Sequence, residues 1–372
     1  MAQHHEVTLL ALVDDVEQGA RDAQALGDLA HRVVLVPLPG RQRKRMQQLK
    51  FAATLRSYLL TEFSPPTASA ALATLYQRQP YAAVLFESVL VAGLAVPPGV
   101  RVLLDQHNIE HELVRRTYEQ ETRPARKLYS LIEFRSLKVG ELQRCRRAEH
   151  VLVTSERERA LLAGLVPSTH LTVMPNGVDI ESFTGAARAG EVSGRVVFTG
   201  TLGYHPNTQA VMHFARTCWP RIHAEEPDAT WLIVGSDPPP EVRRLAKLPG
   251  VRVTGTVPAV QPYLSQAAVA VVPLLVGGGT RLKILEALAM RVAVVTTSVG
   301  CEGLGLVPGE HALVANTPEE FAAAVVTLLR DPARRAAIAA AGWALVQQQY
   351  AWERCVEPLL RVLKPPLEEP PL

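Results

Sequence analysis

The sequence is poor in cysteine, and the few cysteines it has lie far apart. No two of them have the CxxC spacing of a zinc site, and a disulfide-stapled scaffold would have several in a much shorter chain. The pattern excludes both classes and favours a reducing compartment. The four cysteines of the 372 residues are Cys145, Cys218, Cys301 and Cys355.

Long hydrophobic runs and a leader sequence are also lacking. No apolar run approaches the roughly 18 residues of a transmembrane helix, and the longest candidate, near Ser88–Val96, ends at Pro97. The N-terminal sequence MAQHHEVTLL has no basic flank, apolar core or cleavage site of a signal peptide. We therefore expect a cytoplasmic protein.

The chain also lacks a large excess of charge of either sign. The chain carries 39 Lys and Arg against 36 Asp and Glu, for a formal net charge of +3, which argues against a nucleic-acid partner. What the chain has in quantity is apolar residues, at 48%, which exclude a disordered or fibrous class. Its length fits two domains better than one.

Twelve short apolar, β-branched runs recur along the chain, with helical patterns such as Gln209–Ile222 between them. The runs are continuous rather than alternating, which is typical of strands buried on both faces of a parallel sheet. We therefore predict an α/β protein with two doubly wound domains of six strands each. The runs are Glu6–Val13, Arg32–Leu38, Tyr81–Ser88, Arg101–Gln106, His150–Ser155, Leu171–Pro175, Arg195–Gly200, Trp231–Ser236, Val251–Thr256, Ala267–Leu274, Val292–Ser298 and His311–Asn316.

The domain boundary is predicted near the Asn176-Gly177 turn signal. The first domain then covers residues 1–177 and the second residues 178–350. A helix over 351–363 is expected to pack back on the first domain, and the proline-rich tail 364–372 is expected to be disordered.

The segment Gly277–Glu286 has the strongest functional pattern. A predicted strand runs into three glycines and a helix, which lets a ligand approach free backbone N–H groups. Arg281 and Lys283 lie in the first turn, where cations are locally unfavourable, and an anion such as a diphosphate would resolve the conflict. Glu286 could accept hydrogen bonds from a ribose diol. The alternative is a flexible loop with solvated charges.

A second candidate site is Asp105–His111, which follows a predicted strand. Ligands bind at the carboxyl ends of parallel strands, so His107 and Asn108 are expected to face a crevice. The order H-x-x-E-H from His107 through Glu110 to His111 also matches one group of metalloproteases. We disfavour that alternative, because His107 lies at a strand–helix junction. A capping or core role for His107 remains open.

Two weaker patterns complete the set. The turn Thr199–Asn207 has a Gly-x-x-Gly order that could bring N–H groups to a ligand, but such turns are common in α/β folds. Five basic residues and no acid fall within Arg41–Lys50. With the apolar helical positions up to Leu59, the segment suits either an anionic membrane surface or an ordinary solvated helix.

These residues resemble family 4 retaining glycosyltransferases of the GT-B type, over nearly the whole chain. The first half is similar to a subgroup linked to bacterial exopolysaccharide assembly, on Asp105–Glu110 and Phe86–Ser88. The matching segments of the second half are Val173–Asp179, Val197–Gly200, Leu232–Gly235, Val253–Thr256, Ala270–Leu274, Gly277–Ala287, Gly309–Val314 and Tyr350–Trp352.

The resemblance implies two Rossmann-like domains with a cleft between them, and transfer of a sugar from a UDP- or GDP-sugar to a saccharide or lipid-linked acceptor. It implies no cofactor and no metal, because cations and a helix end neutralise the diphosphate. Arg281 and Lys283 would stabilise that charge, and His107 would lie near the sugar. The implied donor-binding residues are Gly200, Thr201, Thr256, Val257, Gly278, Gly279, Thr280, Leu282 and Glu286, and the implied acceptor or sugar residues are Asn108, Glu110 and Glu302.

Three departures from the family pattern stand out. Gly278 occupies the position of the first acid of the E-x7-E motif whose second acid is Glu286, and Glu302 is a candidate substitute. The stretch Thr201–Asn207 lacks the family's usual Arg and Lys. Against the family pattern, we also expect one βα unit of about 30 residues to be missing before the first strand.

Two other classes stay open. One is another GT-B enzyme, such as a nucleotide-sugar epimerase or a phosphorylase. The other is a binding protein that kept the fold and lost the activity. A nicotinamide dehydrogenase is disfavoured, because no strand–GxGxxG–helix pattern is present. The sequence does not identify the sugar, the nucleotide or the acceptor. It does not identify the oligomeric state either.

Overall fold

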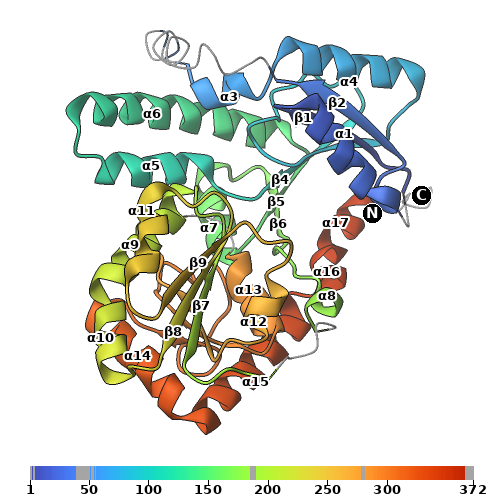
Figure 1. Ribbon diagram of the computed structural model, residues 1–372. Coiled ribbons are helices and arrows are strands. Elements are labelled where there is room, and N and C mark those ends of the chain that lie inside the picture. The colour runs from blue at the N-terminus through green and yellow to red at the C-terminus, as the bar shows by residue number, and fades with distance from the viewer. Residues whose placement is uncertain are drawn as a thin grey trace. The chain divides into compact units, whose positions relative to one another are not determined.

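The computed structural model describes residues 2, 5–38, 51, 54, 56–184, 190–277 and 281–364 (Figure 1). The chain forms two compact units, one of Met1–Met174 with Pro358–Leu372 and one of Pro175–Glu357. All twelve predicted strands are present in the structure, each within about two residues of its expected ends. The basic segment Arg41–Lys50 and nearly all of the tail 364–372 lie outside the described residues.

The second unit contains one parallel sheet of six strands, in the order β12-β11-β10-β7-β8-β9. This is the doubly wound order of nucleotide-binding domains, in which ligands bind beyond the carboxyl ends of the strands where the order reverses, here between β7 and β10. The strands are β7 (Arg195–Thr199), β8 (Thr230–Val234), β9 (Val251–Gly255), β10 (Val269–Val272), β11 (Ala293–Thr296) and β12 (Leu313–Val314).

Both faces of this sheet are covered, which is why its strands read as continuous apolar runs. Val196 and Phe198 pack into one buried cluster, and Val197, between them, packs into another. The helices are α8 (Ile180–Thr184), α9 (His205–Thr217), α10 (Trp219–Glu225), α11 (Pro240–Arg243), α12 (Gln261–Leu264), α13 (Leu282–Ala289), α14 (Pro318–Arg330), α15 (Pro332–Gln349) and α16 (Trp352–Cys355).

The six strands of the first unit form two parallel sheets. The first two strands pair with each other, and the other four follow one another in chain order. The strands are β1 (Thr8–Val13), β2 (Arg32–Pro37), β3 (Ala83–Phe86), β4 (Arg101–Gln106), β5 (His150–Val153) and β6 (His170–Val173). The helices are α1 (Val16–Ala25), α3 (Tyr58–Glu62), α4 (Pro66–Arg78), α5 (Glu110–Gln120), α6 (Pro124–Arg147) and α7 (Glu156–Leu165).

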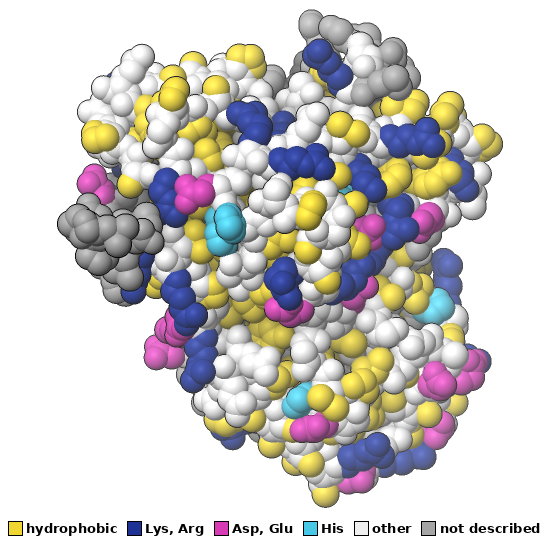
Figure 2. All heavy atoms as spheres, turned by 180° about the vertical axis from the view of Figure 1, so that it is seen from behind, with side chains coloured by type: hydrophobic (Ala, Val, Ile, Leu, Met, Phe, Trp, Pro, Cys, Tyr) yellow, Lys and Arg dark blue, Asp and Glu magenta, His cyan; other side chains and the backbone are white. Residues whose placement is uncertain are grey.

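The surface of the first unit is rich in cations. In the rear view, Lys and Arg side chains recur across its face, with hydrophobic side chains between them (Figure 2). On α6, exposed Arg135 and Arg146 lie on the same helix as Leu128 and Val139, whose side chains are 60% and 59% exposed. No helix among the described residues is both long enough and apolar enough to cross a membrane.

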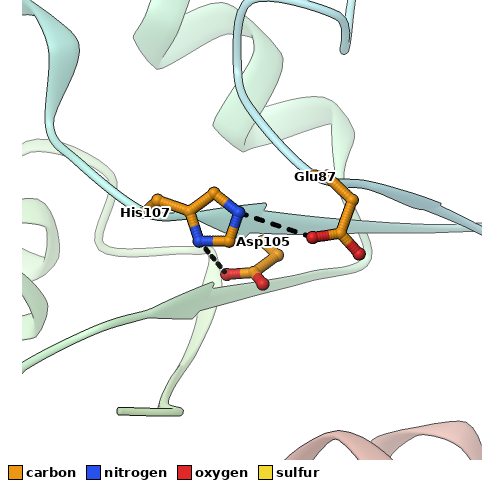
Figure 3. A group of neighbouring side chains, drawn as sticks. All are labelled: Glu87, Asp105 and His107. Atoms are coloured by element: carbon orange, nitrogen blue, oxygen red, sulfur yellow. Dashed lines mark ion pairs between the residues drawn. The ribbon is translucent and has the colours of Figure 1, made fainter. Parts of the chain in front are cut away.

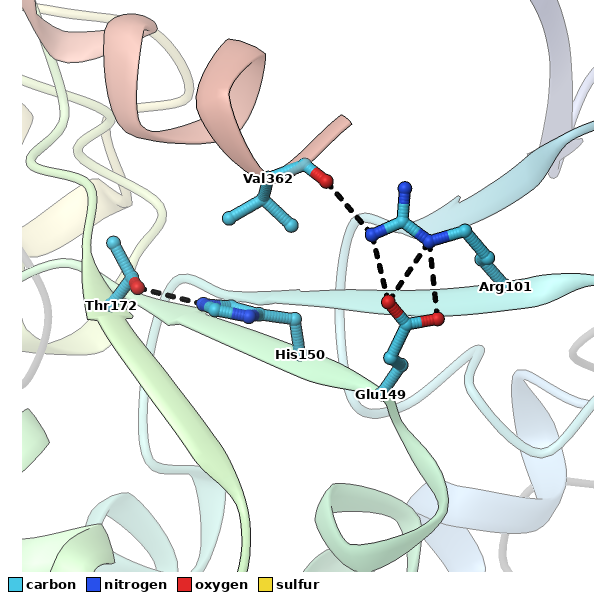
Figure 4. A network of polar contacts seen from close by, with 5 residues as sticks. All are labelled: Arg101, Glu149, His150, Thr172 and Val362. Carbon is cyan, nitrogen blue, oxygen red and sulfur yellow. Dashed lines mark hydrogen bonds and ion pairs between the residues drawn. The ribbon is translucent and has the colours of Figure 1, made fainter. Parts of the chain in front are cut away.

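The C-terminal helix differs from its prediction. The pattern over 351–363 predicts one helix, but the structure has two, α16 and α17 (Glu357–Leu363). Residues just before and in α16 stay with the second unit, where Val178 N–H donates to the Tyr350 carbonyl. The end of α17 packs on the first unit, where Arg101 donates to the Val362 carbonyl at 2.8 Å and pairs with Glu149 at 2.7 Å (Figure 4).

Helix α6 anchors the first unit through buried charge. Glu141, which is fully buried, accepts hydrogen bonds from the backbone N–H groups of Glu110 and His111 at 3.0 and 2.9 Å and from His111 Nδ1 at 2.9 Å. It also accepts from the Gln106 side-chain amide. Its carboxylate therefore caps the N-terminus of α5, where the helix has unpaired donors and a positive dipole end.

The same face of α6 repeats this device two turns earlier. Glu133, also buried, accepts from Ser57 Oγ at 2.5 Å and from the Tyr58 N–H at 3.1 Å, at the start of α3. Arg144, on the same helix, pairs with backbone acceptors instead of donors. It donates to the carbonyls of Val89 and Leu60 at 2.6 and 3.1 Å. One helix thus satisfies backbone groups of several connecting segments.

We expect Glu141→Ala to lower the free energy of unfolding of the first unit by about 3 kcal/mol or more, because several buried donors would lose their acceptor. Urea unfolding, together with hydrogen exchange of the α5 amides, measures the effect. The control is Glu119→Ala on α5, which removes only a half-exposed ion pair with Arg115 and should change stability by less than about 0.5 kcal/mol. Equal stability of the two variants would contradict the assigned role of Glu141.

Candidate functional site

In the second unit, the candidate site begins at the turn after β7. Gly200 has φ +147°, a conformation that L side chains rarely adopt, and a Cβ built on it would lie 2.6 Å from Lys283 Nζ. Its N–H donates to the Val234 carbonyl at 3.0 Å, and a Cβ on Gly235 would collide with the Gly200 carbonyl oxygen. Two strand ends thus approach each other so closely that only glycine fits, and the amine of Lys283 occupies the space beside them.

Lys283, in the first turn of α13, is held by two kinds of contact. Its Nζ donates to Asn207 Oδ1 at 2.7 Å and lies 4.3 Å from the centre of the Phe198 ring. Burial, with the nearby charge of Arg281, lowers the pKa of Lys283 to about 7, although Glu286 opposes the shift. The amine of Lys283 is therefore only partly protonated at neutral pH, and a bound anion would favour its protonated form.

Arg281 and Glu286 complete the charged part of this site. Arg281 immediately precedes α13, is 9% exposed, and lies against Gly277, where a Cβ would be 2.7 Å from its Nη2. Burial raises the pKa of Glu286, and the charge of Lys283 works against that shift. Two cations at the start of a helix whose N–H groups also favour anions make an arrangement suited to a diphosphate.

The remaining predicted donor residues are distributed around the same unit. Thr201 follows Gly200 and is exposed, and Thr256 and Val257 follow the end of β9, with Val257 packed against the core. Leu282 is 43% exposed on α13, and Glu302 is half-buried in the loop after β11. Gly278, Gly279 and Thr280 lie outside the described residues.

In the first unit, His107 follows β4 and lies between two carboxylates (Figure 3). Its Nε2 is 3.4 Å from Glu87 Oε2, and its Nδ1 is 3.7 Å from Asp105 Oδ1. The hydrogen bond to Glu87 is the main cause that raises the pKa of His107, against the effect of burial. Burial raises the pKa of Asp105 to about 7, although His107 lowers it. The arrangement favours a protonated imidazole.

Glu87, Asp105 and His107 could also hold a cation, because one ligand atom from each lies within 4.8 Å of the others. The two carboxylates face opposite nitrogens of the ring, however, and a single metal ion bonds to only one of them. The geometry therefore fits a charged histidine between two acids better than it fits a metal centre. That the protein works without a metal stays a prediction.

The other predicted residues of this loop have different positions. Asn108 is half-buried. Glu110 begins α5, and its pKa is raised to about 7 by burial and by the charge of Glu141, while His107 lowers it. His111 is buried and bonded to Glu141, and His107 precedes the helix, so the two histidines do not have the helical spacing of a metalloprotease.

Sequence reasoning did not select Glu87 or Asn207 as site residues. Glu87 follows β3, and the neighbouring strand β4 leads to His107, so adjacent predicted strands carried a signal for the pair. Asn207 is the last residue of the weak candidate turn Thr199–Asn207. Its contact with Lys283 joins residues 76 positions apart, and nothing in the local sequence announces it.

The pair of His107 and Glu87 leads to a test by titration. The pKa of His107 is raised in the folded protein, so the stabilisation from this pair is fully present below the ordinary pKa of 6.5 and is lost as the pH rises through the folded value. Glu87→Gln should therefore move the pKa of His107 downward, as measured by imidazole NMR. Glu156→Gln, an exposed change on α7, should leave it in place. An unmoved His107 pKa in Glu87→Gln would count against the pairing.

Two family models match the chain. One, described as Glycosyltransferase Family 4, matches residues 1–182, and the other, described as Glycosyl transferases group 1, matches residues 193–331. Between them they leave unmatched only a short internal stretch and the C-terminal residues after 331.

The curated relatives are more distant. An uncharacterized 44.6 kDa protein in the cps region of Klebsiella pneumoniae is 25% identical over 163 residues, which are 42% of each chain. A GDP-mannose-dependent monoacylated alpha-(1-6)-phosphatidylinositol monomannoside mannosyltransferase of Corynebacterium glutamicum is 27% identical over 220 residues, covering 51% of this chain and 55% of that protein. The chain thus matches about half the length of these relatives.

Solved structures share the fold over almost the whole chain. Sucrose-phosphate synthase from Thermosynechococcus elongatus has a TM-score of 0.69 at 17% identity, with 96% of this chain and 97% of that chain covered. Anabaena HepE in complex with UDP and glucose has a TM-score of 0.65 at 12% identity, with 97% and 99% covered. These structures show the fold, which is GT-B. The two family models, over residues 1–182 and 193–331, show that the chain belongs to glycosyltransferase family 4.

Proposed function

We propose that the protein is a retaining glycosyltransferase that moves a sugar from a UDP- or GDP-sugar to an acceptor hydroxyl in polysaccharide or glycoconjugate biosynthesis. The observation that carries the proposal is the buried amine of Lys283, held beside Gly200, with Arg281 two residues earlier at the same helix start. A closed glycine turn with two cations suits the diphosphate of a nucleotide-sugar. The names of the relatives agree, since one is a GDP-mannose-dependent transferase and another was solved with UDP and glucose.

In the proposed reaction, the bond between the sugar and the diphosphate breaks while the acceptor hydroxyl approaches from the same face. The diphosphate gains negative charge as it leaves, and Arg281 and Lys283 stabilise that charge without a metal ion. The leaving phosphate accepts the proton of the acceptor hydroxyl. Glu286 binds the ribose, and His107 orients the sugar. The acceptor is a saccharide or a lipid-linked saccharide, with membrane contact through the segment Arg41–Leu59.

Calorimetry with UDP and with GDP, followed by an assay of each nucleotide-sugar, tests the proposal. Binding of one of them, with release of nucleoside diphosphate coupled to formation of a glycoside, is the expected result. Epimerase or phosphorylase activity would give a different product balance and would contradict it. Failure of the protein to bind either nucleotide would favour a GT-B protein without transferase activity.

Lys283→Ala should lower the transfer rate at least about 10²-fold, the usual cost of losing one group that stabilises transition-state charge. Steady-state kinetics with the donor found by calorimetry measures the loss. Lys247→Ala is the control, because Lys247 is an exposed lysine of the same unit and should leave the rate unchanged. A Lys283→Ala enzyme of normal rate would remove Lys283 from the mechanism.

The affinity for nucleoside diphosphate should also depend on pH. The ammonium form of Lys283 binds the anion, and its pKa is about 7 in the free protein, so the affinity should fall as the pH rises through 7, by up to about tenfold per pH unit. Calorimetry in buffers of different ionisation enthalpy would detect the proton taken up on binding. The trend should be weaker in Lys283→Ala, and the same pH slope in both proteins would contradict it.

A further inference from the structure

Asn207 lies near the start of α9, and both the oxygen and the nitrogen of its side-chain amide form hydrogen bonds. Its Oδ1 accepts the hydrogen bond from Lys283 at 2.7 Å, and its Nδ2 donates to the Thr201 carbonyl at 2.8 Å. The residue is 7% exposed, so both groups are paired within the protein. Asn207 thereby joins α13 to the turn that follows β7.

The contact depends on the glycine between the two side chains. A Cβ on Gly200 would lie 3.1 Å from Asn207 Nδ2 and 2.6 Å from Lys283 Nζ. A structural role at the start of α9 needs no partner on α13, because the N–H of Asn207 already donates to the Tyr204 carbonyl at 2.9 Å. The bond to Lys283 therefore calls for a separate explanation.

We propose that Asn207 is a positioning residue, which holds the amine of Lys283 beside the Gly200 turn for contact with the donor diphosphate. The proposal rests on the proposed function. An ammonium group has three N–H donors, and Asn207 takes one of them, which leaves two for phosphate oxygens. The amide is neutral, so it fixes the amine without cancelling its charge.

This role accounts for a departure from the family pattern. The stretch Thr201–Asn207 lacks the usual Arg and Lys, so it supplies no cation of its own. It supplies a neutral acceptor that fixes a cation of α13. Burial keeps the pKa of Lys283 near 7 in this position, so a carboxylate in place of the amide would raise it.

The test compares Asn207→Asp and Asn207→Leu, two variants of similar size, with the control Thr208→Val. Thr208 Oγ1 donates to the Leu202 carbonyl at 2.5 Å, so the control loses a hydrogen bond to the same turn without a contact to Lys283. Acetylation of Lys283 by an acetyl ester, followed across pH by peptide mass spectrometry, reports its protonation without any substrate. Thermal unfolding of each variant checks the fold.

Asn207→Asp should raise the midpoint of Lys283 acetylation by at least about one pH unit, since an added carboxylate favours the ammonium form. Thr208→Val should leave the midpoint in place. A midpoint that Asn207→Asp does not move would overturn the proposal, whether or not the protein binds a nucleotide.

UDP and GDP binding supplies the second measurement. Asn207→Leu should weaken binding of the preferred nucleotide at least about tenfold, by the scale for a hydrogen bond to a charged group, and Thr208→Val less than about twofold. In a Lys283→Ala background, Asn207→Leu should cost nothing further, because it acts through Lys283. The same loss in both backgrounds would reduce Asn207 to a structural residue. If the unaltered protein binds neither nucleotide, the proposed function fails, and the acetylation result still decides the contact.

Discussion

The amine of Lys283 is withdrawn from water, and the arrangement around the candidate site of the second unit follows from that. A buried cation is unfavourable unless its hydrogen bonds and its charge are compensated. Here a neutral amide and an aromatic ring supply partial compensation, and the pKa falls to about 7. The missing part of the compensation is negative charge, which the proposed diphosphate would bring. The glycine at position 200 keeps that place open.

The first unit deals with buried charge in a different way. Glu133 and Glu141 are almost completely buried, yet each accepts several hydrogen bonds from the start of a neighbouring helix. Their carboxylates are paired with donors inside the fold, so we assign them a role in the stability of the first unit and not in the reaction. His107 and Asp105 lie next to this framework and differ from it, because their pKa values are raised and their contacts are longer. Such groups remain available to a ligand.

The fold could be predicted from the sequence because both faces of a parallel sheet are covered, which makes each strand a continuous apolar run. Two features of the structure could not be predicted from the sequence. The helix over 351–363 is divided into α16 and α17, although its helical pattern runs on across the break. The contact of Arg101 with Val362, between residues far apart in the chain, shows where the second part packs. The bond between Asn207 and Lys283 joins two helices that are far apart in the chain, and local patterns carry no signal for such a contact.

The charged groups of the two candidate sites have pKa values that are shifted in opposite directions. The pKa of His107 is raised, mainly by its hydrogen bond to Glu87, so its surroundings favour the charged form before any ligand binds. The pKa of Lys283 is lowered, so this group becomes fully charged only when an anion is present. In the proposed reaction, the diphosphate carries more negative charge in the transition state than in the intact donor. A lysine whose protonation rises with that charge therefore binds the transition state more strongly than the donor, and this difference in binding lowers the barrier.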